Sequence, residues 1–285
     1  MAGMKISHDQ GYLLLAFGAK KYLDMAYVCA LSIRHYDRER PIQLVTDVDA
    51  GALDYGHRVF DLISTIDVPR AACGPMLKLE AYRYSAFAET LFIDTDCFVL
   101  KSRIRRIWED LSEDYEFGIP GEVKKSGTWY DMPIAEMCRA AEIVSLVQIN
   151  SGAFFFKRGQ VAESVFAEAK QFHDTLGNVT GLLHYGTTPS DEPFLAMALG
   201  KIGIVPMPVI DEMGQALMLT TINGREFELD AFSGFPHFRK GKTLAYPTIV
   251  HFPGVAPREI YLSLAEKFTL RYSKNDWPNI KARLE

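Results

Sequence analysis

Short apolar runs alternate with helix-like segments over the first hundred residues of this chain. Residues 11–17 and 41–46 have the length and apolar content of buried strands, and residues 59–68 contain a third such run. Apolar side chains at helical spacing predict a helix between the first two runs, with Asp24 as its N-cap and an end near His35. Such alternation restricts the fold to those in which helices connect neighbouring parallel strands.

The alternation continues up to an acidic cluster. After a Gly-Pro start signal a helix is expected over residues 76–87, and the apolar run 90–94 predicts a buried strand that ends at Asp94. Strand–helix–strand units build a largely parallel sheet with helices on both faces. Ligands of such sheets bind beyond the carboxyl ends of the strands. The predicted fold class is therefore α/β, a Rossmann-like mixed but mostly parallel sheet flanked by helices, with Asp94 at its ligand-binding edge.

The second half of the chain is less regular. Helices are expected over residues 104–111, 133–143, 160–176 and 191–199, and strands over 146–156, 202–206 and 248–252. The apolar run 146–156 is interrupted near its middle by Asn150, and residues 210–242 show no clear period. Because no repeat, low-complexity tract or linker divides the 285 residues, a single domain over 1–285 is predicted.

Composition and charge argue against several classes of protein. The net charge is −5 and no basic run could follow a phosphodiester backbone, so nucleic acid is not an expected partner. The four cysteines (Cys29, Cys73, Cys97 and Cys138) form no Cys-x-x-Cys pair and indicate neither a zinc site nor a disulfide framework. No run of eighteen apolar residues predicts a transmembrane segment, and the polar start lacks the apolar stretch of a signal peptide. We expect a cytoplasmic protein that meets a membrane only at its surface.

The segment LFIDTDCFVL places Asp94 and Asp96 two residues apart. In an extended chain these side chains share a face, and two carboxylates about 4 Å apart repel by about 4 kcal/mol at an effective dielectric of about 20. A hard divalent cation relieves the repulsion and can also bridge to the oxygens of a diphosphate. A second Asp-x-Asp, Asp47 and Asp49, leads into an Ala-Gly turn and is interpreted as a solvated turn. The first pair differs because apolar residues flank it on both sides, where charge needs compensation.

His251 is a candidate third metal ligand. It ends the apolar, strand-like segment 248–252 and could therefore lie at the same edge of the sheet as the two aspartates. A lone histidine at such a position is also commonly a hydrogen-bonded structural residue, and the residues alone leave both interpretations open. An imidazole beside two carboxylates favours Mn²⁺, with Mg²⁺ as the alternative.

Six short motifs in order resemble the retaining glycosyltransferases of family 8, the group that contains glycogenin and bacterial galactosyltransferases of lipopolysaccharide assembly. The motifs are Phe17-Gly-Ala-Lys-Lys-Tyr22, Met76-Leu-Lys-Leu-Glu-Ala-Tyr82, Phe92-Ile-Asp-Thr-Asp-Cys97, Asn150-Ser-Gly-Ala-Phe154, Asp191-Glu192 and His251-Phe-Pro-Gly254. The resemblance implies a glycosyltransferase-A fold, a UDP-sugar donor and a carbohydrate, lipid-linked or protein hydroxyl acceptor. It also implies a donor-binding half over about 11–100, an acceptor-side half over about 101–260, and a C-terminal helical segment over about 257–283.

The resemblance also implies roles for single residues. Asp94, Asp96 and His251 would hold the metal, and the ring of Tyr22 would stack on uracil. Lys78 and Asp191 would act on the reaction itself, Lys78 near the donor phosphates and Asp191 near the reacting carbon. The implied donor-binding residues are Phe17, Tyr22, Lys78, Asp94, Thr95, Asp96, Asn150, Ser151, Gly152, Glu192, Gly254 and Arg258.

Three positions depart from the family pattern. Lys21 precedes Tyr22 where Asp or Asn is more familiar nearby. The family often follows its His-Phe-x-Gly motif with a phosphate-binding Lys-Pro-Trp, whereas this chain has Val255-Ala-Pro-Arg258. Arg258 is the candidate replacement cation, at a spacing shifted by one residue. Glu192 stands where the family usually has glutamine. These departures leave the sugar unassigned.

Three other functions have less support from the sequence. A haloacid dehalogenase-type phosphohydrolase also uses Asp-x-Asp, but its motif wants Thr or Val four residues after the first aspartate, where this chain has Phe98. An NAD-type Rossmann enzyme would need Gly-x-Gly-x-x-Gly after the first strand, and residues 17–22 lack it. A non-catalytic nucleotide-sugar-binding protein would not need every proposed metal ligand, all of which the sequence retains.

Overall fold

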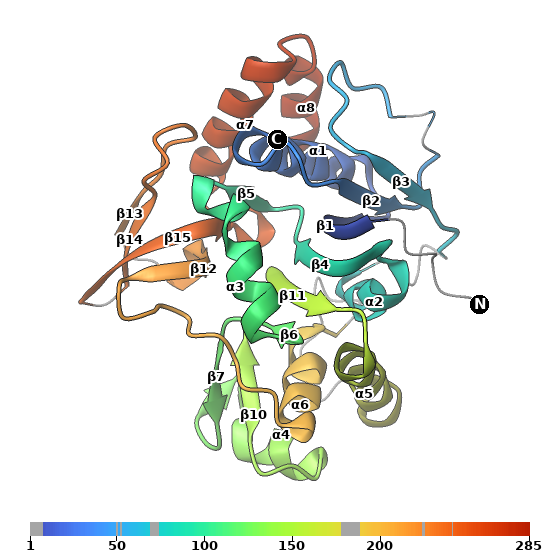
Figure 1. Ribbon diagram of the computed structural model, residues 1–285, viewed down its shortest axis with the longest axis vertical. Helices are drawn as coiled ribbons and strands as arrows, with labels where there is room; N and C mark the ends of the chain where they lie inside the picture. The colour runs from blue at the N-terminus through green and yellow to red at the C-terminus, as the bar shows by residue number, and fades with distance from the viewer. Residues whose placement is uncertain are drawn as a thin grey trace.

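A six-stranded mixed sheet forms the centre of the computed structural model, which describes residues 8–49, 51, 53–68, 74–177, 189–223, 226–240 and 242–285 (Figure 1). Its strands, in spatial order, are β3 (Leu62–Thr65), β2 (Ile42–Thr46), β1 (His8–Ala16), β4 (Phe87–Ile93), β11 (Ala153–Lys157) and β6 (Phe117–Gly118). The first four strands are parallel, and β11 and β6 each pair antiparallel with their neighbours. The predicted α/β class with a mostly parallel central sheet is confirmed.

Alternating side chains of β1 enter two separate apolar cores. Tyr12 and Leu14 belong to the core that contains helix α1 (Lys20–Tyr36), whereas Leu13 belongs to the core on the other face. This is the period of two that a strand buried on both faces requires, and it explains the continuous apolar run. The first core also contains residues of α3 (Ile107–Asp114), α7 (Arg258–Tyr272) and α8 (Trp277–Leu284).

The opposite face of the sheet is covered by helices from the middle of the chain. They are α4 (Ile134–Ala140), α5 (Gln160–Leu176) and α6 (Glu192–Ile202), which lie together in the lower half of Figure 1. The amphipathic prediction for residues 160–176 matches α5 residue for residue. Helix α6 approaches β10 (Leu146–Ile149) closely, because a Cβ on Gly200 would lie 2.2 Å from the carbonyl oxygen of Ser145.

A second sheet brings the C-terminal part of the chain to the acidic motif. It contains β12 (Gln215–Thr220), β15 (Thr243–His251), β14 (His237–Lys240) and β13 (Glu226–Glu228), and β5 (Cys97–Val99) pairs antiparallel with β15. Two small antiparallel pairs complete the strands: β7 (Gly121–Lys124) with β10, and β8 (Thr128–Trp129) with β9 (Met132–Pro133). The β5–β15 register places Cys97 opposite His251, 154 positions apart in the sequence.

Four predictions about elements were wrong. Asp24 does not cap α1 but is fully buried within it, where Arg283 donates two hydrogen bonds to its carboxylate. The helix expected over 76–87 is a 3₁₀ segment, Pro75–Glu80, and a single α turn, α2 (Ala81–Tyr84). The break expected near Asn150 in the strand over 146–156 is present, but it separates two strands that belong to two sheets rather than interrupting one strand. The strand expected over 202–206 is absent because α6 runs to Ile202.

The described cysteines form no disulfide bond. Within the described residues, Cys29, Cys97 and Cys138 are buried free thiols, and Cys73 lies outside those residues. No helix in the described part of the chain is long and apolar enough to cross a membrane.

Candidate active site

A cleft of about 1300 Å³ opens at the carboxyl ends of β1, β4 and β15. Every site residue predicted from the sequence except Gly152 lines it. The lining members of that set are Phe17, Tyr22, Lys78, Asp94, Thr95, Asp96, Asn150, Ser151, Asp191, Glu192, His251, Gly254 and Arg258. The structure thus brings into one space residues that the sequence spreads over more than two hundred positions.

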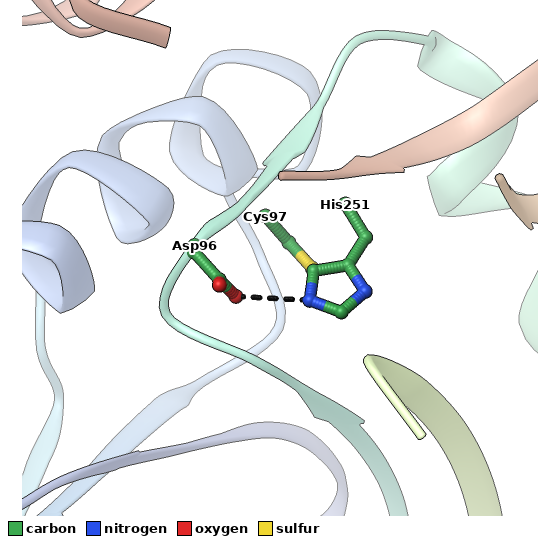
Figure 2. A group of neighbouring side chains, drawn as sticks. All are labelled: Asp96, Cys97 and His251. Atoms are coloured by element: carbon green, nitrogen blue, oxygen red, sulfur yellow. Dashed lines mark ion pairs between the residues drawn. The ribbon is translucent and has the colours of Figure 1, made fainter. Parts of the chain in front are cut away.

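Asp94, Asp96 and His251 face one another in this cleft. Asp94 follows β4, Asp96 precedes β5, and His251 is the last residue of β15. The Nε2 atom of His251 lies 3.2 Å from Oδ1 of Asp96 and 4.0 Å from Oδ2 of Asp94. Figure 2 shows the imidazole edge turned towards the Asp96 carboxylate. Two carboxylates and one imidazole nitrogen therefore converge, which is a donor set suited to a divalent cation.

Cys97 also approaches this group, a proximity that the sequence analysis did not predict. The possible ligand atoms of Asp96, Cys97 and His251 all lie within 4.8 Å of one another (Figure 2). Burial raises the pKa of the Cys97 thiol well above its usual value, and the nearby Asp96 and Asp94 raise it further. The thiol, whose sulfur lies 3.5 Å from the carbonyl oxygen of Gly152, donates to that oxygen. Asp94, whose Oδ2 lies 4.0 Å from Nε2 of His251, is the other candidate third donor and the one that the resemblance implies.

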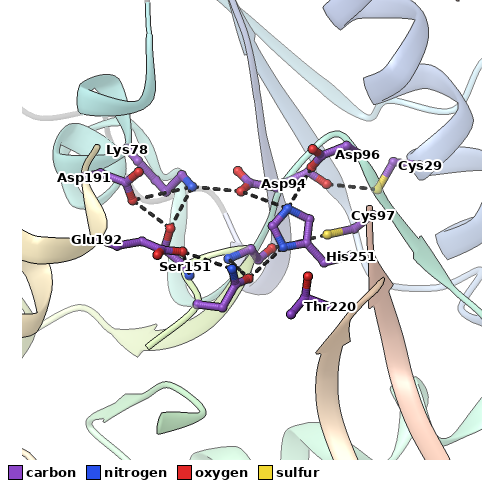
Figure 3. A network of polar contacts seen from close by, with 12 residues as sticks. Cys29, Lys78, Asp94, Asp96, Cys97, Ser151, Asp191, Glu192, Thr220 and His251 are labelled. Atoms are coloured by element: carbon purple, nitrogen blue, oxygen red, sulfur yellow. Dashed lines mark hydrogen bonds and ion pairs between the residues drawn. The ribbon is translucent and has the colours of Figure 1, made fainter. Parts of the chain in front are cut away.

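Lys78 connects the two acidic groups of the cleft (Figure 3). Its Nζ lies 2.8 Å from Oδ2 of Asp94, 2.9 Å from Oγ of Ser151 and 3.5 Å from Oδ2 of Asp191. Burial acts to lower the pKa of Lys78, but Asp191 and Asp94 outweigh it and raise the pKa above its usual value. The ammonium group therefore stays charged and neutralises part of the acidic site.

The carboxylates themselves respond to their neighbours in opposite directions. Burial raises the pKa of Asp94, against the opposing effect of Lys78. Burial would also raise the pKa of Asp96, but His251 outweighs it and lowers that pKa. The pKa of His251 is raised because Asp96 outweighs the effect of burial. A site with this much paired charge binds a cation only by displacing protons.

Asp191 and Glu192 begin α6 and are both held by hydrogen bonds. Asp191 accepts one from Oγ of Ser151 at 2.7 Å. Glu192 accepts from Nδ2 of Asn150 and the backbone N–H of Ser151, each at 3.0 Å, and from the hydroxyl of Tyr130 at 2.7 Å. Burial, then Asp191, raises the pKa of Glu192. Neither carboxylate projects freely into the cleft.

Tyr130 is a site residue that sequence reasoning missed. It lies in the tight turn between β8 and β9, where Tyr130 and Asp131 have φ angles of 52° and 56°. Left-handed backbone is uncommon for such side chains, and the usual sequence signal for this turn is Asn-Gly or Asp-Gly. Tyr130-Asp131 carries no such signal, so only the folded structure reveals that the tyrosine hydroxyl reaches Glu192 and Ser190.

Gly152 lies beneath the cleft and makes room for the metal-facing histidine. A Cβ at this position would lie 2.5 Å from Nδ1 and 2.8 Å from Cγ of His251. Those separations are too short for any side chain, so glycine is required by packing. The backbone there also joins the two halves of the site, because the N–H of Asp94 donates to the Gly152 carbonyl at 2.8 Å.

The far end of the cleft is formed by the start of α1. Phe17 is almost fully buried, and half-buried Tyr22 lies in the first turn with Nζ of Lys21 5.1 Å from its ring centre. The backbone N–H of Gly18 donates to Asp47, and Asp49 accepts a hydrogen bond from the N–H of Gly51. The two carboxylates of the second Asp-x-Asp thus accept hydrogen bonds from backbone N–H groups in two turns.

Gly254 and Arg258 border the cleft from the C-terminal side. Gly254 has a φ of 62°, in the left-handed region that glycine tolerates. The guanidinium of Arg258 donates to the carbonyl oxygens of Leu284, at 2.6 Å, and Glu285. To reach a donor phosphate, Arg258 would have to exchange these carbonyls for phosphate oxygens.

Known structures share this architecture, although no family model matches the sequence and the curated proteins contain no match. The galactosyltransferase LgtC in complex with donor and acceptor sugar analogues is 12% identical, with 95% of this chain and 99% of that one covered and a TM-score of 0.54. An active-site mutant of LgtC, in which glutamate replaces glutamine, is also 12% identical over 90% and 95%, with a TM-score of 0.52.

The fold is of the glycosyltransferase-A type. The apo structure of the bifunctional glycosyltransferase WbbM agrees, at 13% identity and a TM-score of 0.52. The likeness covers 96% of this chain but 51% of WbbM, so this chain corresponds to about half of that protein. At these identities the comparisons establish the fold, and the chemistry has to be argued from the cleft.

Proposed function

We propose that this protein is a metal-dependent glycosyltransferase that transfers a hexose from a UDP-sugar to a hydroxyl acceptor with retention of configuration, as family 8 does. The observation that carries the proposal is the convergence of Asp94, Asp96 and Nε2 of His251 in one cleft, with the Lys78 ammonium 2.8 Å from Asp94. A diphosphate needs both a cation and a further positive group, and this arrangement supplies places for both.

The residues fit a divalent metal ion. Two carboxylates and an imidazole suit Mn²⁺, and Mg²⁺ is the alternative. Asp94, Asp96 and His251 would hold the ion, which supplies Lewis-acid chemistry to the leaving diphosphate when bound. Lys78 would stabilise the charge that grows on the β-phosphate, since the carboxylates of Asp191 and Asp94 outweigh the effect of burial and keep it protonated. Arg258 remains the candidate for a second phosphate contact.

Asp191 is better suited to positioning the sugar than to attacking it. Its carboxylate accepts from Ser151 at 2.7 Å and lies 3.5 Å from Nζ of Lys78, and both contacts lower its nucleophilicity. We assign the uracil end of the donor to Phe17 and Tyr22 at the start of α1. Thr95 and Gly254 line the same cleft.

A haloacid dehalogenase-type phosphohydrolase has less support. Its nucleophile should follow the first strand and stand free, whereas Asp94 follows β4, the fourth strand in chain order, and is paired with Lys78. Trapping of an aspartyl-phosphate mimic with beryllofluoride would reinstate that function. A non-catalytic nucleotide-sugar-binding protein would use the same cleft, so only turnover separates it from an enzyme.

One experiment tests donor class and turnover together. UDP-glucose, UDP-galactose and their N-acetylated forms are screened by thermal shift with and without Mn²⁺, and hydrolysis of the best binder is then followed without acceptor. We expect Mn²⁺-dependent stabilisation by at least one donor and slow hydrolysis that Asp191→Asn reduces. Binding without any hydrolysis would identify a non-catalytic protein, and absence of metal-dependent binding would reject the proposal.

A further inference from the structure

Glu192 fixes the orientation of the neighbouring Asn150 amide. Its Oε1 accepts the backbone N–H of Ser151 at 3.0 Å, and a backbone N–H can only donate. The same oxygen lies 3.0 Å from the amide of Asn150, so the Asn150 atom that faces it must be the NH₂ group. This assignment holds whether or not the other oxygen, Oε2, carries a proton. Figure 3 shows Glu192 and Ser151 on one side of His251.

The orientation of Asn150 in turn fixes the tautomer of His251. With its NH₂ on Glu192, the carbonyl oxygen of Asn150 faces Nδ1 of the imidazole at 2.6 Å and the N–H of Gly152 at 3.3 Å. An amide oxygen can only accept, so Nδ1 must carry a hydrogen. Nε2, which faces Asp96 and Asp94, is therefore the nitrogen that can offer a lone pair to a cation once its own proton is displaced.

We infer that Glu192, acting through Asn150, is a positioning residue for the metal ligand His251. The inference rests on the proposed metal site. It differs from the donor-binding role that the family resemblance implies for both residues, because these side chains are engaged in hydrogen bonds within the protein. Oε2 of Glu192 accepts from Tyr130 at 2.7 Å, which completes the set.

The network predicts which substitutions it tolerates. In Glu192→Gln, the amide oxygen can face Ser151 and Asn150, and the NH₂ can donate to the Tyr130 hydroxyl. That hydroxyl can then turn its proton from residue 192 to Oγ of Ser190, which lies 2.9 Å away. Glu192→Gln therefore preserves the tautomer. Glu192→Ala leaves the Ser151 N–H without its partner and leaves the NH₂ of Asn150 unpaired, so that only the contacts to Gly152 and His251 orient the amide. Asn150→Ala removes the contact to His251 directly.

Mn²⁺ titrated calorimetrically into the protein, without nucleotide, tests the inference. Loss of an outer partner of a metal-ligating histidine typically weakens metal binding about 10- to 100-fold. We expect that loss in Glu192→Ala and Asn150→Ala, native affinity in Glu192→Gln, and no further loss in the double alanine variant, because both changes act on one pathway. Thermal unfolding checks that each variant is folded. A folded form of either single alanine variant is sufficient to test the inference.

The outcomes separate this inference from the proposed function. If His251→Ala binds Mn²⁺ with unchanged affinity, the proposed metal site itself is refuted. His251→Ala with weakened binding, but Glu192→Ala and Asn150→Ala with native binding, would overturn the positioning role and leave the function standing. Donor hydrolysis gives a second readout: a positioning defect in Glu192→Ala is restored by saturating Mn²⁺, whereas loss of a sugar contact persists at every Mn²⁺ concentration.

Discussion

Replacing Gly152 by alanine is expected to displace the imidazole of His251 although none of the proposed metal ligands is substituted. The new Cβ would lie 2.5 Å from Nδ1 of His251, so the ring must move by about 0.9 Å to reach ordinary contact at 3.4 Å. Metal–ligand distances tolerate only about 0.2 Å. The ring is also held at 2.6 Å by Asn150, and overpacking of this kind costs about 1–3 kcal/mol. Mn²⁺ affinity should fall at least tenfold, which corresponds to about 1.4 kcal/mol.

Calorimetric titration of Mn²⁺ and urea unfolding measure the two effects of Gly152→Ala. The matched control is Gly159→Ala, because the nearest atom to a Cβ at that position is 4.0 Å away. Gly159 precedes α5, and alanine there should cost less than about 1 kcal/mol with no change in Mn²⁺ affinity. Native metal affinity in Gly152→Ala would refute the claim that His251 is packed into place as a ligand.

Two further predictions concern stability away from the metal. Asp24→Ala should lower the free energy of unfolding by about 2–3 kcal/mol in urea unfolding, because it removes the buried partner of Arg283, while Mn²⁺ affinity stays native. An equal loss from Asp230→Ala, whose ion pair is exposed, would contradict this. Burial and two neighbouring arginines lower the pKa of His35, so its contribution to stability is full above about pH 6.5 and is lost as pH falls below that value. His35→Gln should therefore lose less stability than the native protein between pH 7.5 and 5.5, and equal losses would show that His35 is not responsible.

Local pattern was sufficient to predict the sheet edge that carries the acidic motif. The apolar residues on both sides of Asp94 and Asp96 marked a buried strand end, and Asp94 directly follows β4 as predicted. The expected extended chain between the two aspartates was wrong, because Thr95 and Asp96 lie in a turn in which the N–H of Cys97 donates to the Asp94 carbonyl at 3.1 Å. The apolar flanks also separated this pair from Asp47 and Asp49, whose carboxylates accept backbone N–H groups of turns. Amphipathic periodicity likewise predicted α5 to the residue.

The features that could not be predicted from the sequence depend on contacts between distant parts of the chain. Asp24 has the residue type and position of a helix cap, but its real partner is Arg283, 259 residues later. Strands β12, β13 and β14 have no usable period of their own: β12 and β14 pair with β15, and β13 pairs with β14. Tyr130 lies in a turn with left-handed backbone, and the residues of that turn give no sequence signal for it. Each of these depends on a distant part of the chain.

The central claim is that Asp94, Asp96 and His251 hold a cation that binds the diphosphate of UDP. Calorimetric titration of UDP with and without Mn²⁺ tests it most directly, on the native protein, on Asp96→Asn, and on Asp49→Asn as the matched control from the second Asp-x-Asp. We predict that Mn²⁺ strengthens UDP binding to the native protein and to Asp49→Asn, and that Asp96→Asn abolishes this strengthening. Mn²⁺-linked UDP affinity retained in Asp96→Asn would contradict the assignment of the site.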